Sequence, residues 1–267
     1  MRLQRRAFLN ALLASAGWPA VAGRAAAAPK KSTRFVFHVS RAASGPFDQI
    51  YAPIIAELEK RGFPSMLVHS SVEGSNTPNE DRASAVLNAL RGVKDPVAIV
   101  GVSNEGSFLP LVAAARPVRR LVYVNATIPR PGRAFIEACQ TEQVAVPGSY
   151  LDGLLKAAQG VSDDFLRLIH DPNATKEQLK AMQVRINATP SAHVMVGFYE
   201  VCPLKALPKV DNVCVSGAAD DQIRPEWEQS TARRLLGVEP VIISGAGHAD
   251  IYTTRPGEFA DTCVQGL

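Results

Sequence analysis

The chain lacks the paired ligand motifs that are typical of metal sites. Its five histidines are scattered, and it contains no His-x-x-x-His and no Cys-x-x-Cys pair. It also lacks a basic stripe with interleaved aromatic residues, and it shows no internal repeat. The sequence therefore predicts no metal site and no nucleic-acid partner.

Acidic residues are absent from the first 28 positions, which carry four arginines. Two of these, Arg5 and Arg6, form a twin-arginine pattern ahead of an apolar region over 11–22. That region is too short, and too interrupted by glycine and proline, to span a bilayer stably, and no cysteine follows it for a lipid anchor. We predict a twin-arginine-type signal peptide over 1–28, with a retained amphipathic helix as the alternative.

This interpretation makes the protein periplasmic or secreted, with the twin-arginine export machinery as its partner in transit and no stable membrane anchor after signal removal. Without the four early arginines, the rest of the chain carries equal numbers of basic and acidic residues. The pI of 8.9 therefore says little about partners.

Cysteine is scarce, with four residues in the chain: Cys139, Cys202, Cys214 and Cys263. An even number in an exported protein permits two disulfides with three possible pairings. Free cysteine buried in an α/β core is equally common. The sequence leaves both possibilities open.

Short β-rich apolar runs alternate with helical patterns along most of the chain. Strands are expected at 35–39, 65–69, 97–100, 121–125, 210–216 and 240–244, and helices at 48–61, 82–90, 107–115, 226–236 and 256–264. This alternation predicts the α/β class, with a parallel sheet covered by helices on both faces. Because only helical patterns occur over 133–204, we expect an α/β core over 29–132 and 205–267, interrupted by a helical cap.

Ser103 follows a buried apolar run in the stretch Gly101-Val102-Ser103, and a second apolar stretch begins at Phe108. A strand, a sharp turn and a helix in this order are typical of a nucleophile elbow. The start of the helix would offer backbone N–H groups to a developing oxyanion. The alternative is a plain connection between a strand and a helix.

A serine nucleophile needs a base to take its proton and an acid to orient that base. Asp220 and Asp221 follow the strand at 210–216, and His248 follows the strand at 240–244. The order serine, acid, histidine is that of hydrolases with a nucleophile elbow, and all three loops leave the carboxyl ends of strands. We predict a catalytic triad of Ser103, Asp220 and His248, with Asp221 as the alternative acid.

An oxyanion hole of this type takes one N–H from the residue after the nucleophile, which is Asn104, and one from the loop after the first strand. Ser40 is the candidate for the second donor, and a simple turn residue is its alternative role. His38, which precedes this loop, is expected to fix the loop rather than to act as a second base.

In these stretches the chain resembles the α/β-hydrolase superfamily, in the branch of small esterases and hydroxynitrile lyase-like proteins. The resemblance covers 34–267 and is carried by the stretches 35–38, 101–106, 117–123, 198–203, 236–240 and 247–256. It implies a mostly parallel eight-stranded sheet, a helical cap and chemistry without a cofactor. Counting back without a gap from Leu236 places the family's acid at Asp220.

The chain departs from the family pattern at three positions. Val39 and Glu105 stand where the family usually has glycine, and Val102 stands where it usually has a polar residue. These departures concern the oxyanion loops and the substrate site rather than the triad.

Together these residues predict a serine hydrolase that cleaves a small carboxylic ester through an acyl-enzyme on Ser103. One alternative is a hydroxynitrile lyase-like cleavage in the same fold, in which His248 moves protons and no acyl-enzyme forms. The other is a catalytically silent periplasmic binding protein, which the residues at Val39 and Glu105 would suit.

Overall fold

The computed structural model describes residues 33–39, 46–70, 77–149, 151–153, 175, 196–248 and 250–267. Within them, six parallel strands form one sheet in the order β2-β1-β3-β4-β5-β6. The strands are β1 (Arg34–Val39), β2 (Ser65–His69), β3 (Val97–Val102), β4 (Arg120–Val124), β5 (Asp211–Gly217) and β6 (Val241–Ile243). The predicted α/β class and parallel sheet are confirmed, while the two further strands implied by the resemblance stay a prediction.

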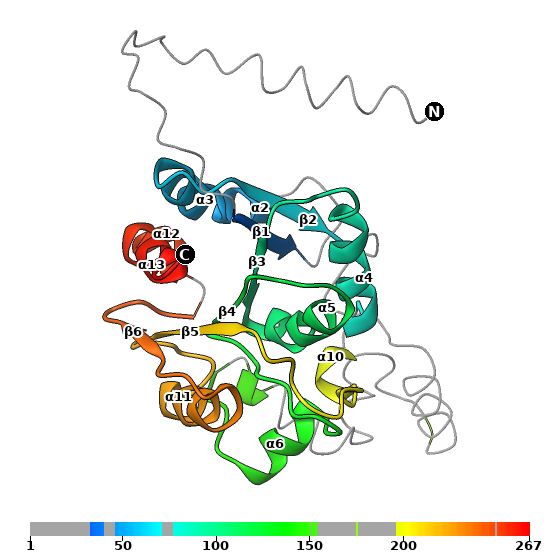
Figure 1. The fold of residues 1–267 in the computed structure, drawn as a ribbon. Helices are drawn as coiled ribbons and strands as arrows, with labels where there is room; N and C mark the ends of the chain where they lie inside the picture. The colour runs from blue at the N-terminus through cyan, green and yellow to red at the C-terminus, as the bar shows by residue number, and fades with distance from the viewer. Residues whose placement is uncertain are drawn as a thin grey trace, which may run out of the picture.

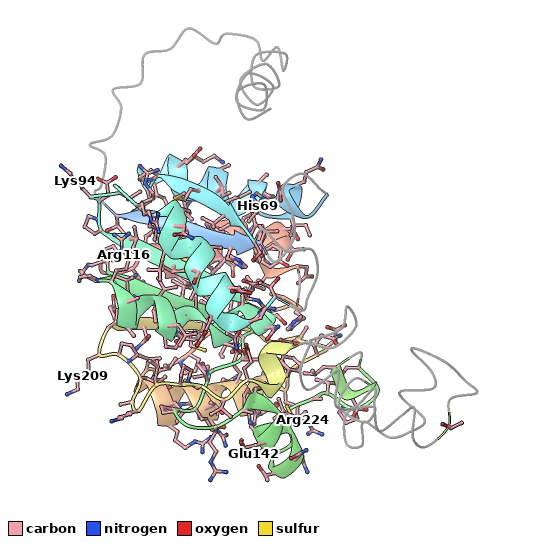
Figure 2. The ribbon with its side chains drawn as sticks, turned by 90° about the vertical axis from the view of Figure 1, so that its right-hand side faces the viewer. His69, Lys94, Arg116, Glu142, Lys209 and Arg224 are labelled. Carbon is pink, nitrogen blue, oxygen red and sulfur yellow. The ribbon has the colours of Figure 1, made fainter. Side chains whose placement is uncertain are left out.

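The strand order reverses between β1 and β3, since the chain first moves outward to β2 and then returns past β1. Open α/β sheets bind ligands at the carboxyl ends of strands beside such a reversal. Figure 2 shows Lys94, Arg116 and Lys209 at the side of the molecule where strands begin, and His69 and Arg224 toward the opposite side. The loops that carry the predicted triad follow the carboxyl ends of β3, β5 and β6.

Helices cover both faces of the sheet (Figure 1). One face packs against α3, α12 and α13, and the other packs against α4, α5 and α11. The helices are α2 (Pro46–Ile50), α3 (Ala52–Lys60), α4 (Asn79–Ala89), the 3₁₀ helix η1 (Ser103–Ser107), α5 (Leu109–Ala115), α6 (Phe135–Thr141), α10 (Val196–Tyr199), α11 (Pro225–Thr231), the π-helical turn η2 (Ala232–Leu236), α12 (Ile251–Thr254) and α13 (Pro256–Val264).

The strands are apolar on both faces because both faces are covered. In β3, Ala98 and Val100 belong to the core beneath α3 and α13, whereas Val97 and Ile99 belong to the core beneath α4 and α5. All six β3 residues are buried. The continuous apolar runs read from the sequence therefore mark a sheet with two cores.

Two predicted helices differ in detail from the observed ones. The helix expected over 48–61 is interrupted at Tyr51, because Pro53 in the first turn of α3 lacks the N–H that would continue the hydrogen bonds of α2. The helix expected over 226–236 is α-helical only to Thr231 and then widens into η2. It ends at Gly237, whose φ of 68° is left-handed.

Most of the predicted cap over 133–204 lies outside the described residues. Its described parts are α6, 151–153 and α10, which share a small apolar cluster with Ile223 and Trp227 of the core. All four cysteines are free, which agrees with the packed alternative rather than with disulfides. In the part of the chain that is described, none of the helices has the length and apolar character to cross a membrane.

Arg120 ties the start of β4 to the C-terminal segment. Its guanidinium is 4% exposed and donates to Asp211 Oδ2 at 2.8 Å, to Cys263 O at 2.6 Å and to Gln265 O at 2.8 Å. Arg120→Ala would leave a carboxylate and two carbonyls without this partner. We expect it to lower the free energy of unfolding by about 2–4 kcal/mol, measured by urea denaturation.

Arg233→Ala is the control, because Arg233 is 50% exposed in an ion pair with the 79% exposed Glu239. Its effect should stay below about 1 kcal/mol. Equal losses in the two variants would show that Arg120 does not anchor the C-terminal segment.

Candidate active site

Ser103 lies at the end of β3, on the sharp turn that the sequence predicts. Its φ of 55° is in the left-handed region, which for a residue other than glycine stores about 1–3 kcal/mol of strain. The turn continues into η1 and packs directly on the loop after β4. A side chain at Gly106 would place its Cβ 2.2 Å from Thr127 O, so this position admits only glycine.

The structure brings Ser103, His248 and Asp220 together from three loops. His248 Nε2 lies 2.8 Å from Ser103 Oγ, and His248 Nδ1 lies 2.8 Å from Asp220 Oδ2. A carboxylate can only accept, so Nδ1 carries the proton and Nε2 of the neutral ring accepts the hydroxyl proton of Ser103. This arrangement could remove a proton from the serine as it attacks.

The two candidate acids occupy different surroundings. The Asp220 side chain is 1% exposed, whereas Asp221 is on the surface. Besides facing His248, Asp220 accepts hydrogen bonds at Oδ1 from the backbone N–H of Gln222 at 2.7 Å and of Ile223 at 2.9 Å. Asp220 thus also holds its own turn, and it is the acid that faces the imidazole.

Asn125, which the sequence reading missed, links the acid loop to the histidine loop. This fully buried residue follows β4 with a φ of 45°. Its amide oxygen accepts from Gly217 N at 2.6 Å, and its amide nitrogen donates to the carbonyls of Gly247 and His248, each at 2.9 Å. The only signal in the sequence is an asparagine directly after a strand, a residue type that tolerates left-handed backbone.

The two predicted oxyanion donors have different outcomes. Asn104 is buried and is the second residue of η1, where N–H groups have no acceptor within the helix. The carbonyl of Ser103 accepts from Thr127 N at 3.0 Å, which fixes the peptide unit that carries the Asn104 N–H. Ser40 lies outside the described residues, so its role stays a prediction.

The sequence profile of the alpha/beta hydrolase family matches residues 11–262. The chain belongs to the alpha/beta hydrolase family. The family resemblance read from the motifs is thereby confirmed. No curated protein matches the chain by sequence.

Solved alpha/beta hydrolases share the fold at low sequence identity. An extracellular alpha/beta-hydrolase from a Paenibacillus species, described as a structural and functional homologue of tobacco salicylic acid binding protein 2, is 18% identical with a TM-score of 0.58 over 87% of this chain and 98% of that one. Polyneuridine aldehyde esterase is 15% identical with a TM-score of 0.57 over the same shares. A pyrethroid hydrolase from Sphingobium faniae is 17% identical with a TM-score of 0.52 over 86% and 94%.

In this alpha/beta hydrolase, the segment after α6 is tied to the core by a charged cluster. Glu142, just after α6, accepts from Arg130 at 2.6 Å to each carboxylate oxygen and from Trp227 Nε1 at 2.6 Å. Figure 2 shows Glu142 and Arg224 on the same end of the molecule. Nowhere in the described ranges do three or more His, Cys, Asp or Glu side chains gather as a metal ion would require.

A second buried carboxyl group lies near the triad acid. Glu228 of α11 is fully buried, accepts from Ala126 N at 2.7 Å and hydrogen-bonds the hydroxyl of Ser216 on β5. Burial, together with the nearby charge of Asp220, raises the pKa of Glu228 from 4.5 to about 8, against the hydrogen bonds that lower it. Glu228 is thus protonated at neutral pH and joins the acid strand to the loop after β4.

This pKa predicts a pH-dependent stability. An unfolded chain releases the Glu228 proton near pH 4.5 and the folded protein near pH 8, so the folded state binds more protons between these values and loses stability as the pH rises. Glu228→Gln mimics the protonated form. We expect wild type to lose a few kcal/mol relative to this variant between about pH 5 and pH 8.5, measured as unfolding free energies in urea.

Glu226→Gln is the matched control, since Glu226 is an exposed residue in the same helix. Its stability profile should run parallel to that of wild type. Parallel profiles for wild type and Glu228→Gln would contradict the raised pKa.

Proposed function

We propose that this protein is an exported serine hydrolase that cleaves a small carboxylic ester through an acyl-enzyme on Ser103. The observation that carries the proposal is the continuous hydrogen-bonded chain from Ser103 through His248 to Asp220, with distances of 2.8 Å at both steps. The family and the esterases among its structural neighbours support the same reaction class.

In the first half-reaction, Ser103 Oγ attacks the acyl carbon while His248 Nε2 takes the hydroxyl proton. Asp220 keeps the other ring nitrogen protonated and stabilises the imidazolium that forms. The tetrahedral intermediate then expels the alcohol, which receives its proton from His248. What remains is an ester between the acyl group and Ser103.

In the second half-reaction, His248 takes a proton from water, and the resulting hydroxide attacks the acyl-enzyme. Collapse of this intermediate releases the acid and returns the proton to Ser103. In both intermediates the oxyanion would accept hydrogen bonds from the N–H groups of Asn104 and Ser40, each worth about 3–4 kcal/mol in comparable sites. No step needs a metal or another cofactor.

A fluorophosphonate probe and a series of p-nitrophenyl esters of increasing acyl length test this mechanism. We expect one probe molecule per wild-type chain. Ser103→Ala should abolish labelling and lower kcat by at least about 10³-fold, and Asp220→Asn should lower kcat by about 10³–10⁴-fold because the ring loses its tautomer. The acyl series gives the preferred chain length.

The neighbouring acid supplies the control. Asp221→Asn removes the same charge one residue away, on an exposed side chain, and should change kcat by less than about twofold. A folded wild-type protein that neither reacts with the probe nor hydrolyses any ester would favour the silent binding protein. Cyanohydrin cleavage without probe labelling would favour the lyase.

We further propose export through the twin-arginine machinery. The pair Arg5 and Arg6 ahead of an apolar region supports this route, and the extracellular location of the Paenibacillus hydrolase supports export in general. Replacing both arginines by lysine should retain the full-length protein in the cytoplasm of a bacterium with this machinery, as measured by fractionation and mass of the product. Equal export of the double variant and wild type would rule out the route.

A further inference from the structure

A second serine–histidine–carboxylate array lies beside the elbow. The ring of His38, on β1, contacts Glu105 Oε2 through Nδ1 and lies 2.7 Å from Ser70 Oγ through Nε2. The carboxylate accepts from Nδ1–H, and Nε2 of the neutral ring then accepts from the Ser70 hydroxyl. The connectivity is that of Ser103, His248 and Asp220.

Burial gives the two arrays different roles. Ser70 and His38 are each only 2% exposed, and the His38 ring packs edge-on against Phe108 with 5.0 Å between ring centres. A substrate has no access to a hydroxyl in this position, whereas Ser103 is partly exposed. The buried array therefore serves to hold backbone segments together rather than to attack a substrate.

The array joins the segment that carries the proposed oxyanion donor to the end of β1. Glu105 directly follows Asn104, whose N–H is the first proposed donor, and His38 lies one residue before the end of β1. Ser70 completes the array from the end of β2, and its N–H donates to Val39 O at 3.2 Å. The array thus links the elbow with the segment that leads into the first loop.

The negative charge of Glu105 is balanced locally. The guanidinium of Arg82, 1% exposed in α4, interacts electrostatically with Glu105 and with Glu200, while burial lowers its pKa. With its amide oxygen toward Arg82, Asn104 accepts two hydrogen bonds of 3.0 and 3.1 Å from the same guanidinium. Asn104 is therefore anchored in two ways. Its side chain binds Arg82, and the next residue, Glu105, binds His38.

We propose that Glu105 is a positioning residue, which fixes the elbow, and with it the Asn104 N–H, against the end of β1 through its hydrogen bond to His38. This inference rests on the proposed function. The family's usual glycine at this position could not make such a link. The residue that departs from the elbow motif thus supplies a contact between β1 and η1.

Glu105→Ala and Glu105→Gln test this role. Fluorophosphonate titration first gives the concentration of reactive Ser103, so that kcat is expressed per active site. We expect Glu105→Ala to lower kcat by about 10–100-fold with KM changed by less than about threefold, because misplaced donors weaken transition-state binding more than substrate binding. Glu105→Gln keeps an acceptor for His38 and should stay within about threefold of wild type.

Glu59→Ala is the control, since Glu59 is exposed on α3, and it should leave kcat unchanged. If Glu105→Ala does not fold, Ser70→Ala tests the positioning role instead. This smaller change removes the hydrogen bond between Ser70 and His38 at the other end of the array. We expect it to lower kcat by about three- to tenfold.

The outcomes separate this inference from the proposed function. Unchanged kcat per active site in folded Glu105→Ala, or equal losses in Glu105→Gln and Glu105→Ala, would overturn the positioning role while Ser103 still reacts. Absence of probe labelling in wild type would overturn the proposed function and the positioning role with it. A loss confined to Glu105→Ala, restored in Glu105→Gln, supports the hydrogen-bonded link.

Discussion

The hydrogen bond between His248 and Ser103 joins the loops of two strands that are three positions apart in the sheet, and the site depends on it. β3 and β6 are separated by β4 and β5, so their backbones lie about 14 Å apart. The loop after β6 must cross back over both strands before its imidazole reaches the serine. Asn125, which follows β4, supports this crossing, because its amide nitrogen donates to the carbonyls of Gly247 and His248.

This crossing is possible because the carboxyl ends of β3, β4, β5 and β6 lie at nearly the same height in the sheet. Val102 pairs with Val124, Val124 pairs with Val215, and Gly217 pairs with Ile243. A slip of one residue at any of these ladders would turn a core side chain to the wrong face, so the two apolar cores lock the register. At Gly217 a Cβ would lie 2.4 Å from Ala246 O, which shows how closely the acid loop and the histidine loop approach.

Residues with strained backbone lie at the same carboxyl ends of the strands. In the described residues, Ser103 and Asn125 are the non-glycine residues with positive φ, and each follows one of two neighbouring strands. Strain of this kind persists only where the surroundings over-determine the conformation. Here Thr127 N holds the Ser103 carbonyl, and three side-chain hydrogen bonds hold Asn125. The packed cores therefore stabilise two conformations that neither residue would adopt alone.

Local pattern sufficed for the strands and for the turns that carry Ser103, Asp220 and His248, because each depends on a few adjacent residues. Each turn begins where a buried apolar run ends, and the parallel arrangement of the strands places such turns together at the carboxyl ends. Asn125 could not be assigned in this way, since its role comes from the spatial order of β3, β4 and β5. Glu226 and Glu228 look alike in the sequence, and only the docking of α11 decides which is buried. Glu105 was read as a departure from a motif, because its partner, His38, is 67 residues away.

Three carboxyl groups surround a site where negative charge would develop, and each is compensated differently. Asp220 accepts hydrogen bonds from His248 Nδ1 and from two backbone N–H groups. Glu228 keeps its own proton at neutral pH, because it is fully buried. Glu105 faces His38 and lies in the field of the Arg82 guanidinium. An uncompensated carboxylate here would oppose an oxyanion most strongly, since little water screens it. Each of the three carboxyl groups is therefore hydrogen-bonded, paired or protonated, which limits the repulsion that it would exert on the intermediate.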